Sequence, residues 1–289
     1  MSRIALGTAQ FGLPYGIANQ DGQVNRTMAR TMLQLAAARG IDTIDTAIAY
    51  GESEACLGAV GVSGFRVVTK LPAVPQGCAD VELWAQQQVD ASLGRLGVTV
   101  LYGLLLHRPE QLRGNGGKAL YAALQNLKDT GQVKKVGVSI YAAGDLEGLV
   151  PHYPLDLVQA PFNLVDRRLY TTGWLERLKQ MGVEIHTRST FLQGLLLMPH
   201  AVIPLKFSPW ADLWSIWHQW LAGHNVSAVQ ACLAFALSFP EIERVVVGAD
   251  SVSHLEEIIS MPADVMPIDF PDLDCEAENL INPVRWPQL

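Results

Sequence analysis

The sequence predicts a single α/β domain in which eight parallel strands close into a (β/α)8 barrel of the TIM type. The chain has 289 residues, of which 49% are hydrophobic and 17% are charged, so it suits one large domain with an ample core. Short β-branched apolar runs alternate with amphipathic helical stretches, which is typical of a parallel sheet covered by helices. Eight such units occur, and eight units close into a barrel of about 250 residues.

The predicted strands are short apolar runs. They cover residues 4–7, 43–45, 67–70, 100–106, 135–139, 157–159, 184–187 and 244–247. Helical patterns lie between them, for example at 81–96, 118–130, 173–181, 228–238 and 254–260. Gly97, Gly131 and Gly182 follow three of these helices, where a left-handed C-terminal residue is expected. Because no linker composition marks a boundary, residues 1–289 are expected to form one domain, with 262–289 as a proline-rich tail over the barrel.

One connection, at 192–223, is longer than a standard loop between strand and helix. It contains Trp210, Trp214, Trp217 and Trp220, whose spacing of four and three residues predicts a helix with one aromatic stripe. We favour packing of this helix on the barrel wall. The alternative is an aromatic wall that lines a substrate pocket.

Bulk properties exclude several function classes. The net charge is −7 without a cluster of Lys and Arg, which argues against nucleic acid. The apolar runs are too short to span a bilayer, and no signal peptide is visible at the start. The four cysteines have no CxxC or metal-like spacing, so they predict reduced thiols in a cytoplasmic protein without a metal site.

Ionisable side chains follow three neighbouring strands. Asp45 ends the second predicted strand, Tyr50 lies in the loop beyond it, Lys70 ends the third strand and His107 follows the fourth. Catalytic groups of such barrels sit at the C-terminal ends of the strands, and neighbouring strands lie about 5 Å apart. We therefore expect the four side chains to meet. Each residue alone could be a cap or a packing residue, but four in this order favour a functional site.

This set of groups suits proton transfer to a carbonyl oxygen. A phenol has a pKa of about 10, and an adjacent buried ammonium favours the phenolate. A carboxylate paired with the lysine keeps it charged, and an imidazole can orient the substrate oxygen. The composite is a general acid for a developing alkoxide. No side chain is an obvious nucleophile, so a hydride from a nicotinamide is the natural candidate.

The block from Gly40 to Glu54, with Leu57 and Gly58 beyond it, is similar to the first signature of the aldo-keto reductase superfamily, and the resemblance covers nearly the whole chain. It implies that Tyr50 is the general acid/base, that Lys70 and Asp45 tune it, and that His107 holds the carbonyl. It also implies an NADPH site, with NADH as the rival. The residues that it assigns to this cofactor are Gly7, Thr8, Ala9, Asp45, Ser139, Gln159, Arg188, Ser189, Gln193, Gly248, Ser251, His254 and Glu257.

The chain departs from this family's pattern at several positions. Ile140 replaces an Asn that holds the carboxamide, and Arg188 takes the place of an aromatic ring that stacks on the nicotinamide. Gly248 and His254 stand where Lys and Arg usually anchor the 2′-phosphate, so this phosphate would depend on Ser251, His254 and backbone N–H groups. The usual N-terminal hairpin that plugs the barrel is expected to be lacking.

The resemblance implies reduction of an aldehyde or ketone, such as a small carbonyl compound or an open-chain sugar. Phe11, Tyr15, Ile48 and Trp210 are the candidates for substrate contact, with plain packing as the alternative for each. A rival hypothesis is a non-catalytic nicotinamide-binding redox sensor or regulatory subunit on the same fold. A third is another barrel enzyme, such as a lyase or isomerase, but it would not need Ser139 and Gln159 at these positions.

Overall fold

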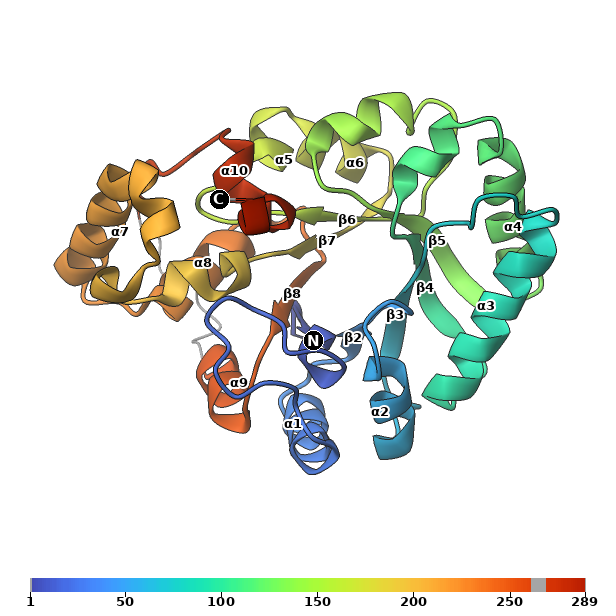
Figure 1. Cartoon of the computed structure of the whole chain (residues 1–289), viewed down its shortest axis with the longest axis horizontal. Helices are drawn as coiled ribbons and strands as arrows, with labels where there is room; N and C mark the ends of the chain where they lie inside the picture. The colour runs from blue at the N-terminus through green and yellow to red at the C-terminus, as the bar shows by residue number, and fades with distance from the viewer. Residues whose placement is uncertain (1, 261–268, 289) are drawn as a thin grey trace.

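A computed structural model describes residues 2–260 and 269–288. Its eight strands form a closed parallel barrel in sequence order (Figure 1), which confirms the predicted fold class. Each strand lies within two residues of its predicted bounds. The strands are β1 (Ile4–Gly7), β2 (Thr43–Asp45), β3 (Arg66–Leu71), β4 (Leu101–Leu106), β5 (Val133–Ser139), β6 (Leu157–Pro161), β7 (Glu184–Arg188) and β8 (Arg244–Gly248).

Helices surround the barrel (Figure 1). Gly97, Gly131 and Gly182 have φ of 66°, 79° and 73°, as expected of residues that end helices. The α-helices are α1 (Arg26–Ala38), α2 (Ser53–Val60), α3 (Val81–Leu96), α4 (Gly117–Asp129), α5 (Arg168–Thr171), α6 (Trp174–Gln180), α7 (Ala211–His224), α8 (Ala228–Leu237), α9 (Val252–Ile259) and α10 (Glu278–Ile281). Of these, α1, α2, α3 and α4 follow one another around the barrel, with α9 beside α1 (Figure 1). Shorter 3-10 helices are η1 (Ala9–Phe11), η2 (Pro109–Arg113), η3 (Ala143–Gly148), η4 (Leu192–Leu197), η5 (His200–Val202), η6 (Leu205–Trp210) and η7 (Pro283–Gln288).

The main apolar core lies between the sheet and the helices, whereas the barrel interior is largely polar. Val68, Leu105 and Leu157 form a small separate apolar cluster. Towards the start of the strands, Glu184 pairs with Lys135 and with His186. Burial acts to raise the pKa of Glu184, but hydrogen bonds from His186 and Lys135 lower it to about 2. The interior therefore tolerates charges because they are paired.

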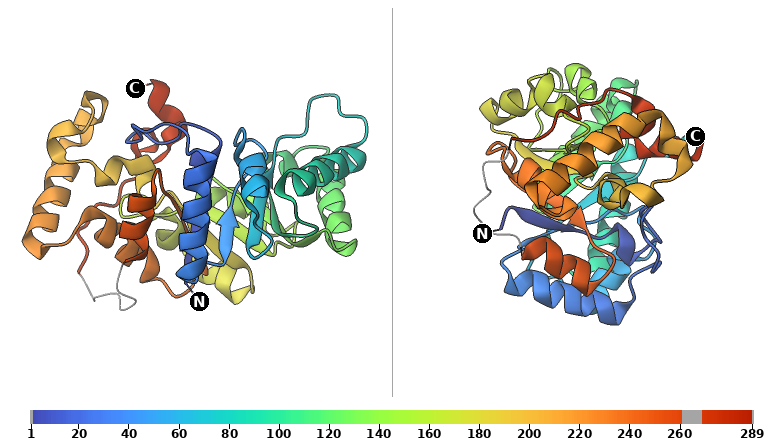
Figure 2. Two further views of the ribbon diagram at one scale, coloured as in Figure 1. Left: turned by 90° about the horizontal axis from the view of Figure 1, so that it is seen from below. Right: turned by 90° about the vertical axis from the view of Figure 1, so that its left-hand side faces the viewer.

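The two ends of the barrel differ in their connections. In the left view of Figure 2, the first loop, the connection from β3 to α3 and the C-terminal η7 lie at one end, and the N-terminus lies at the other. Because the strands are parallel, all of their C-terminal ends lie at one end of the barrel. The longer connections follow these C-terminal ends, so Asp45 and Lys70, which lie at the C-terminal ends of β2 and β3, are at the same end. This is the end at which barrel enzymes place their catalytic groups.

The tryptophan stripe lies on α7, and Trp210 is its N-cap residue. Trp214 and Trp217 are buried, and their indole N–H groups donate to the carbonyl oxygens of Phe207 and Leu196 at 3.1 and 3.0 Å. The helical prediction is confirmed, and Trp214 and Trp217 join the main apolar core. α7 packs mainly on η5 and η6 of its own connection, at the outer edge of the molecule in Figure 1.

The described part of the predicted tail, residues 269–288, packs against the C-terminal end of the barrel. Leu280, Ile281 and Trp286 are buried, and Arg168 pairs with Glu278. Residues 262–268 and 289 of that tail lie outside the described residues. The tail thus adds two short helical turns, α10 and η7, near the long cavity described below.

Candidate active site

Lys70 and Asp45 form a buried ion pair at the mouth of the barrel. Nζ of Lys70 donates to Oδ1 of Asp45 at 2.6 Å and to the carbonyl oxygen of Thr46 at 2.8 Å. The Lys70 and Asp45 side chains are 1% and 6% exposed. Asp45 pairs in register with Val68 of the neighbouring strand, so the two side chains lie on the same face of the sheet. Lys70 lies two residues after Val68 and therefore shares this face, which is the one that points into the barrel.

Gln159 holds the second oxygen of the Asp45 carboxylate. Its Nε2 donates to Oδ2 of Asp45 at 2.7 Å, and its Oε1 accepts from Oγ of Ser139 at 3.3 Å. Gln159 is fully buried. Its amide thus helps to fix the Asp45–Lys70 pair, a role that the sequence did not indicate.

Tyr50 lies in a tight turn that is anchored to the first loop. Its backbone N–H donates to Ala47, and its carbonyl oxygen accepts from the N–H of Ser53, each at 3.0 Å. A Cβ on Gly12 would lie 1.8 Å from that carbonyl oxygen, so the close approach requires glycine there. Ser53 Oγ also donates to the carbonyl oxygen of Thr8 at 2.8 Å. These contacts hold the turn beside the end of β1.

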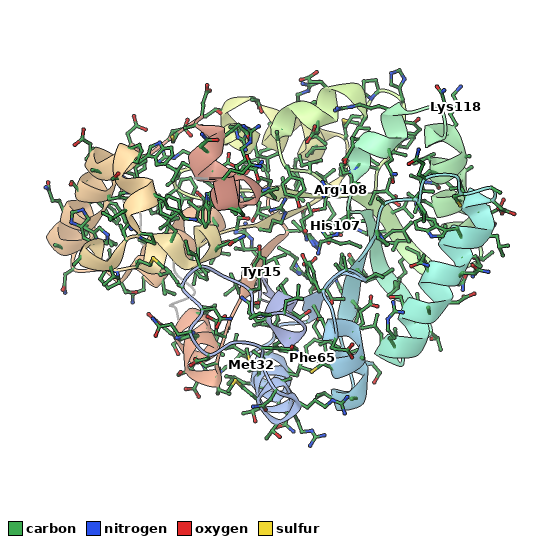
Figure 3. All side chains as sticks on the ribbon, in the orientation of Figure 1. Tyr15, Met32, Phe65, His107, Arg108 and Lys118 are labelled. Carbon is green, nitrogen blue, oxygen red and sulfur yellow. The ribbon has the colours of Figure 1, made fainter. Side chains whose placement is uncertain are left out.

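The structure brings the four predicted catalytic residues together. Nζ of Lys70 lies 5.0 Å from the centre of the Tyr50 ring, and the Tyr50 and His107 rings meet edge to face with centroids 6.0 Å apart. Asp45, Tyr50 and His107 line a common cavity, and Lys70 lies behind them in the barrel interior. Tyr15 and His107 both lie near the middle of the view in Figure 3.

Two of these groups have shifted pKa values. Burial acts to lower the pKa of Lys70, but the charge of Asp45 and the hydrogen bond to it leave that pKa raised. Burial, together with the positive charges of Lys70 and Arg188, lowers the pKa of His107 to about 4. At neutral pH the site therefore holds a charged lysine and a neutral imidazole, which can donate or accept a hydrogen bond.

The cavity beside Tyr50 has a volume of about 890 Å³ and extends over the ends of β1, β7 and β8 to the starts of α8 and α9. This is at the upper end of the range for small-molecule sites. Most of the predicted cofactor residues line it: Gly7, Thr8, Ala9, Asp45, Ser139, Arg188, Ser189, Gln193, Gly248, His254 and Glu257. Of the four candidates for substrate contact, Tyr15 lines it as well.

Five of the residues predicted to contact cofactor or substrate lie outside this lining: Gln159, Ser251, Phe11, Ile48 and Trp210. Ser251 caps α9 by accepting from the N–H of His254 at 3.2 Å. Phe11 is fully buried, and Ile48 packs against the main core. Phe11, Ile48 and Trp210 therefore have the positions of packing residues, because none of the three lines the cavity.

The first loop and the connection after β7 meet across the cavity. The N–H of Ile17 donates to the carbonyl oxygen of Gln193 at 3.1 Å, and Nε2 of Gln193 donates to the Tyr15 hydroxyl at 3.1 Å. Ser189 and Gln193 have φ of 63° and 54°, which is uncommon for residues other than glycine. Thr190 Oγ1, also at this wall, is buried without a hydrogen-bond partner within the described residues.

Arg188 is the cation of the cavity wall on the side of the catalytic residues. Its Nη2 donates to the carbonyl oxygen of Ile140 at 2.9 Å, and its Cζ lies 4.8 Å from the centre of the Tyr141 ring. Among the described residues, no carboxylate forms an ion pair with it. The guanidinium therefore contributes an unneutralised positive charge to this part of the cavity.

Several residues that support the site were not singled out by the sequence analysis. Glu54 is 2% exposed and accepts from Thr69, Ser92 and Arg95, so it joins α2 to β3 and α3. The signal for it was its place in the signature block. Asp250 lines the cavity at the start of α9, where burial raises the pKa of its carboxyl, against the charge of His254 and a hydrogen bond from Gln10.

The fold and the site together define a barrel enzyme whose mouth carries an Asp–Lys–Tyr–His set beside a long cavity. The chain belongs to the aldo/keto reductase family, because the sequence pattern of that family matches residues 3–269. Its class is therefore that of the oxidoreductases.

Curated relatives match parts of the chain. It is 32% identical over 136 residues to an aldo-keto reductase of Mycolicibacterium smegmatis, covering 45% of this chain and 46% of that protein. It is 27% identical over 228 residues to an uncharacterized oxidoreductase of Schizosaccharomyces pombe, covering 75% of this chain and 68% of that protein. The match to the first of these thus spans about half of its length.

Solved structures share the fold over most of the chain. An aldo-keto reductase of Bacillus halodurans in its holo form has a TM-score of 0.72 at 18% identity, covering 90% of this chain and 86% of that one. A putative aldo-keto reductase of Pseudomonas aeruginosa has a TM-score of 0.68 at 22% identity, covering 91% and 90%. At such identities the similarity establishes the fold.

Neither a metal cluster nor a membrane span was found in the described ranges 2–260 and 269–288. Within them, His, Cys, Asp and Glu do not form a group of three that could hold a metal ion. No single helix there is long and apolar enough to cross a membrane. Leu205–His224 and Ala228–Leu237 reach that length and apolar composition only when they are taken together, as a pair bent by 94°.

Proposed function

We propose that this protein reduces an aldehyde or ketone to an alcohol with a nicotinamide cofactor, and that Tyr50 is the general acid. The observation that carries the proposal is the position of Tyr50 between the Lys70–Asp45 pair and His107, at one end of a cavity of about 890 Å³. Small carbonyl compounds and open-chain sugars are the proposed substrates.

The cavity fits a dinucleotide in size and in the groups that it offers. Polar side chains at or just beyond the ends of β1, β5, β7 and β8 line it, namely Thr8, Ser139, Arg188 and Asp250. Its wall also includes the Thr190 hydroxyl, which has no hydrogen-bond partner within the described residues. Ser139 faces it, whereas Gln159 is engaged with Asp45. Gly7, Thr8, Ser139 and Arg188 would hold the nicotinamide end close to Tyr50. When bound, a reduced nicotinamide supplies the hydride that a carbonyl carbon accepts.

The four polar residues have separate roles in this proposal. The Tyr50 hydroxyl donates its proton to the carbonyl oxygen as negative charge develops there. Neutral His107 donates a hydrogen bond to the same oxygen and thereby orients it. Lys70 favours loss of the phenolic proton through its charge. Asp45, held by Gln159, keeps Lys70 charged in the barrel interior.

The rival hypothesis is a nicotinamide-binding redox sensor without turnover. A protein that only binds the cofactor does not need a phenol, Tyr50, placed beside both a buried ammonium, Lys70, and an imidazole, His107. This arrangement supports catalysis, because charged pairs in a barrel interior are costly to desolvate.

A direct assay tests the proposed function. The full-length protein is mixed with reduced nicotinamide cofactor, NADH and NADPH in turn, and with a panel of carbonyl compounds that includes a nitrobenzaldehyde. Loss of absorbance at the reduced-nicotinamide band, dependent on the carbonyl compound, is the expected result. Tight binding of a cofactor without loss of absorbance for any substrate would favour the sensor instead.

A further inference from the structure

The end of the cavity remote from the catalytic residues has a distinct character. From Tyr50 the lining passes over the ends of β1, β7 and β8 and reaches Ser227, His254 and Glu257 at the starts of α8 and α9. Both helices lie outside the ring of strands in Figure 1. If the reacting end of a dinucleotide lies beside Tyr50, as proposed above, its adenosine end lies at this remote end.

Acidic side chains dominate the remote end. Asp250 and Glu257 line it, and the charge of Asp21 acts on Asp250. Among the lining residues that the structure describes, Arg188 is the one Lys or Arg, and it lies at the end of β7 near Ile140. The sequence from 245 to 284 contains neither Lys nor Arg.

Two cations of the C-terminal segment and the long connection, Arg285 and Lys206, are engaged elsewhere. Arg285 pairs with Glu278 at 3.7 Å, and Lys206 donates to the carbonyl oxygen of Trp286 at 3.0 Å. Neither side chain lines the cavity. A phosphate at the remote end would therefore meet no ammonium or guanidinium among the described lining residues.

The start of α9 is also unsuited to an additional phosphate. Helix N-termini favour anions because their first N–H groups are free and their dipole is positive. Here the N–H of His254 already donates to Ser251 Oγ at 3.2 Å. Oδ2 of Asp250 lies 4.0 Å from Nδ1 of His254, so the chain itself supplies a carboxylate to this helix start.

We propose that the remote end of the cavity, through Asp250 and Glu257, selects NADH over NADPH; this inference rests on the proposed function. A carboxylate accepts hydrogen bonds from the hydroxyls of an unphosphorylated ribose, as acidic residues of other nicotinamide sites do. The same carboxylate repels a 2′-phosphate. The charge of the site therefore opposes the NADPH preference that the family resemblance implied.

Binding measurements on the full-length protein test this selection without turnover. Dissociation constants of NADH and NADPH are measured by isothermal titration calorimetry at about pH 8, well above the ordinary pKa of histidine. NADH should bind at least about tenfold more tightly at low salt, which corresponds to about 1.4 kcal/mol. The ratio should shrink between about 0.01 M and about 1 M salt, because the Debye length falls from about 30 Å to about 3 Å. A site that holds the 2′-phosphate with cations would show the opposite trend.

Charge-neutral variants assign the effect to the two residues. Asp250→Asn combined with Glu257→Gln should strengthen NADPH binding relative to NADH by at least about fivefold, since two repulsive charges are removed. Glu256→Gln is the matched control, because Glu256 lies on the same helix and is exposed but does not line the cavity. Its ratio should stay within about twofold of the wild type.

The outcomes separate this inference from the proposed function. Equal affinities, or tighter NADPH binding, in the wild-type protein would overturn the selection of NADH and leave the proposed function standing. Binding of neither cofactor would overturn the proposed function and the inference with it. The wild-type salt series decides the matter even if the double variant fails to fold.

Discussion

Lys70 carries its charge in a place where an isolated ammonium would be very costly. It is 1% exposed, and its Nζ meets the carboxylate of Asp45 and the carbonyl oxygen of Thr46. Desolvation of an ion in a protein interior costs several kcal/mol, which only a close partner and further hydrogen bonds offset. The pair is therefore both a structural element and the source of the positive charge beside Tyr50.

Replacing Lys70 by Met should leave the Asp45 carboxylate buried without its counter-ion. The free energy of unfolding should fall by about 3 kcal/mol, and turnover by at least about 100-fold. Urea denaturation measures the first effect, with Lys118→Met, an exposed site on α4, as the control. The double variant Lys70→Met with Asp45→Asn should regain part of the lost stability. No loss in the single variant would contradict the buried pair.

His107 gives a prediction about pH, because its pKa is lowered to about 4 by burial and by the charges of Lys70 and Arg188. In the unfolded chain a histidine has a pKa of about 6.5. Between these values the unfolded chain binds a proton that the folded protein does not, so this residue makes stability fall as pH falls from about 6.5 to about 4.

Two measurements check this residue. Histidine ¹⁵N chemical shifts should show His107 neutral down to about pH 5, and Arg188→Gln should move its midpoint upwards. As pH is lowered, the free energy of unfolding should fall more for the wild type than for His107→Gln, because the variant lacks this titrating group. A midpoint near the ordinary value of histidine would contradict the electrostatic account of the site.

At the scale of elements, α2 fixes the turn that carries Tyr50. Ser53 begins this helix and bonds the end of β1 through Thr8. Glu54 bonds Thr69 on β3 and both Ser92 and Arg95 on α3. The turn is thus tied to three neighbouring elements, and such supporting contacts keep a catalytic group in its working geometry.

Glu54→Ala should remove the acceptor that these three residues share. We expect a loss of about 3 kcal/mol in the free energy of unfolding, because the buried hydroxyls of Thr69 and Ser92 lose their partner. Thermal or urea denaturation checks this value. Glu52→Ala, at an exposed neighbouring position, should change stability by less than about 0.5 kcal/mol. Equal effects of the two substitutions would show that Glu54 has no special structural role.

At the scale of the whole molecule, the periodicity of the sequence is sufficient to predict the barrel. Short runs rich in β-branched and apolar residues alternate with helical patterns, and the strand bounds predicted from them fall within two residues of those observed. The positions of Asp45, Lys70 and His107 follow from the strands that they end, because all parallel strands of a barrel end at one mouth.

The residues whose surroundings the sequence did not predict lie in loops or take part in side-chain networks. Phe11 and Trp210 were candidates for substrate contact, but one turns into the core and the other begins a peripheral helix. The direction of a loop side chain depends on tertiary packing, which no periodicity encodes. Gln159 faces Asp45 for the same reason. The acidic character of the remote cavity end becomes visible only when β8, α9 and the first loop are brought together.

The most direct test of the central claim is the Tyr50→Phe variant, assayed for both turnover and cofactor binding. The substitution removes the hydroxyl and keeps the ring that packs against His107. We predict that kcat falls by at least about 100-fold, while the dissociation constant of the reduced cofactor stays within about twofold. Turnover at the wild-type rate in this variant would contradict the assignment of Tyr50 as the general acid.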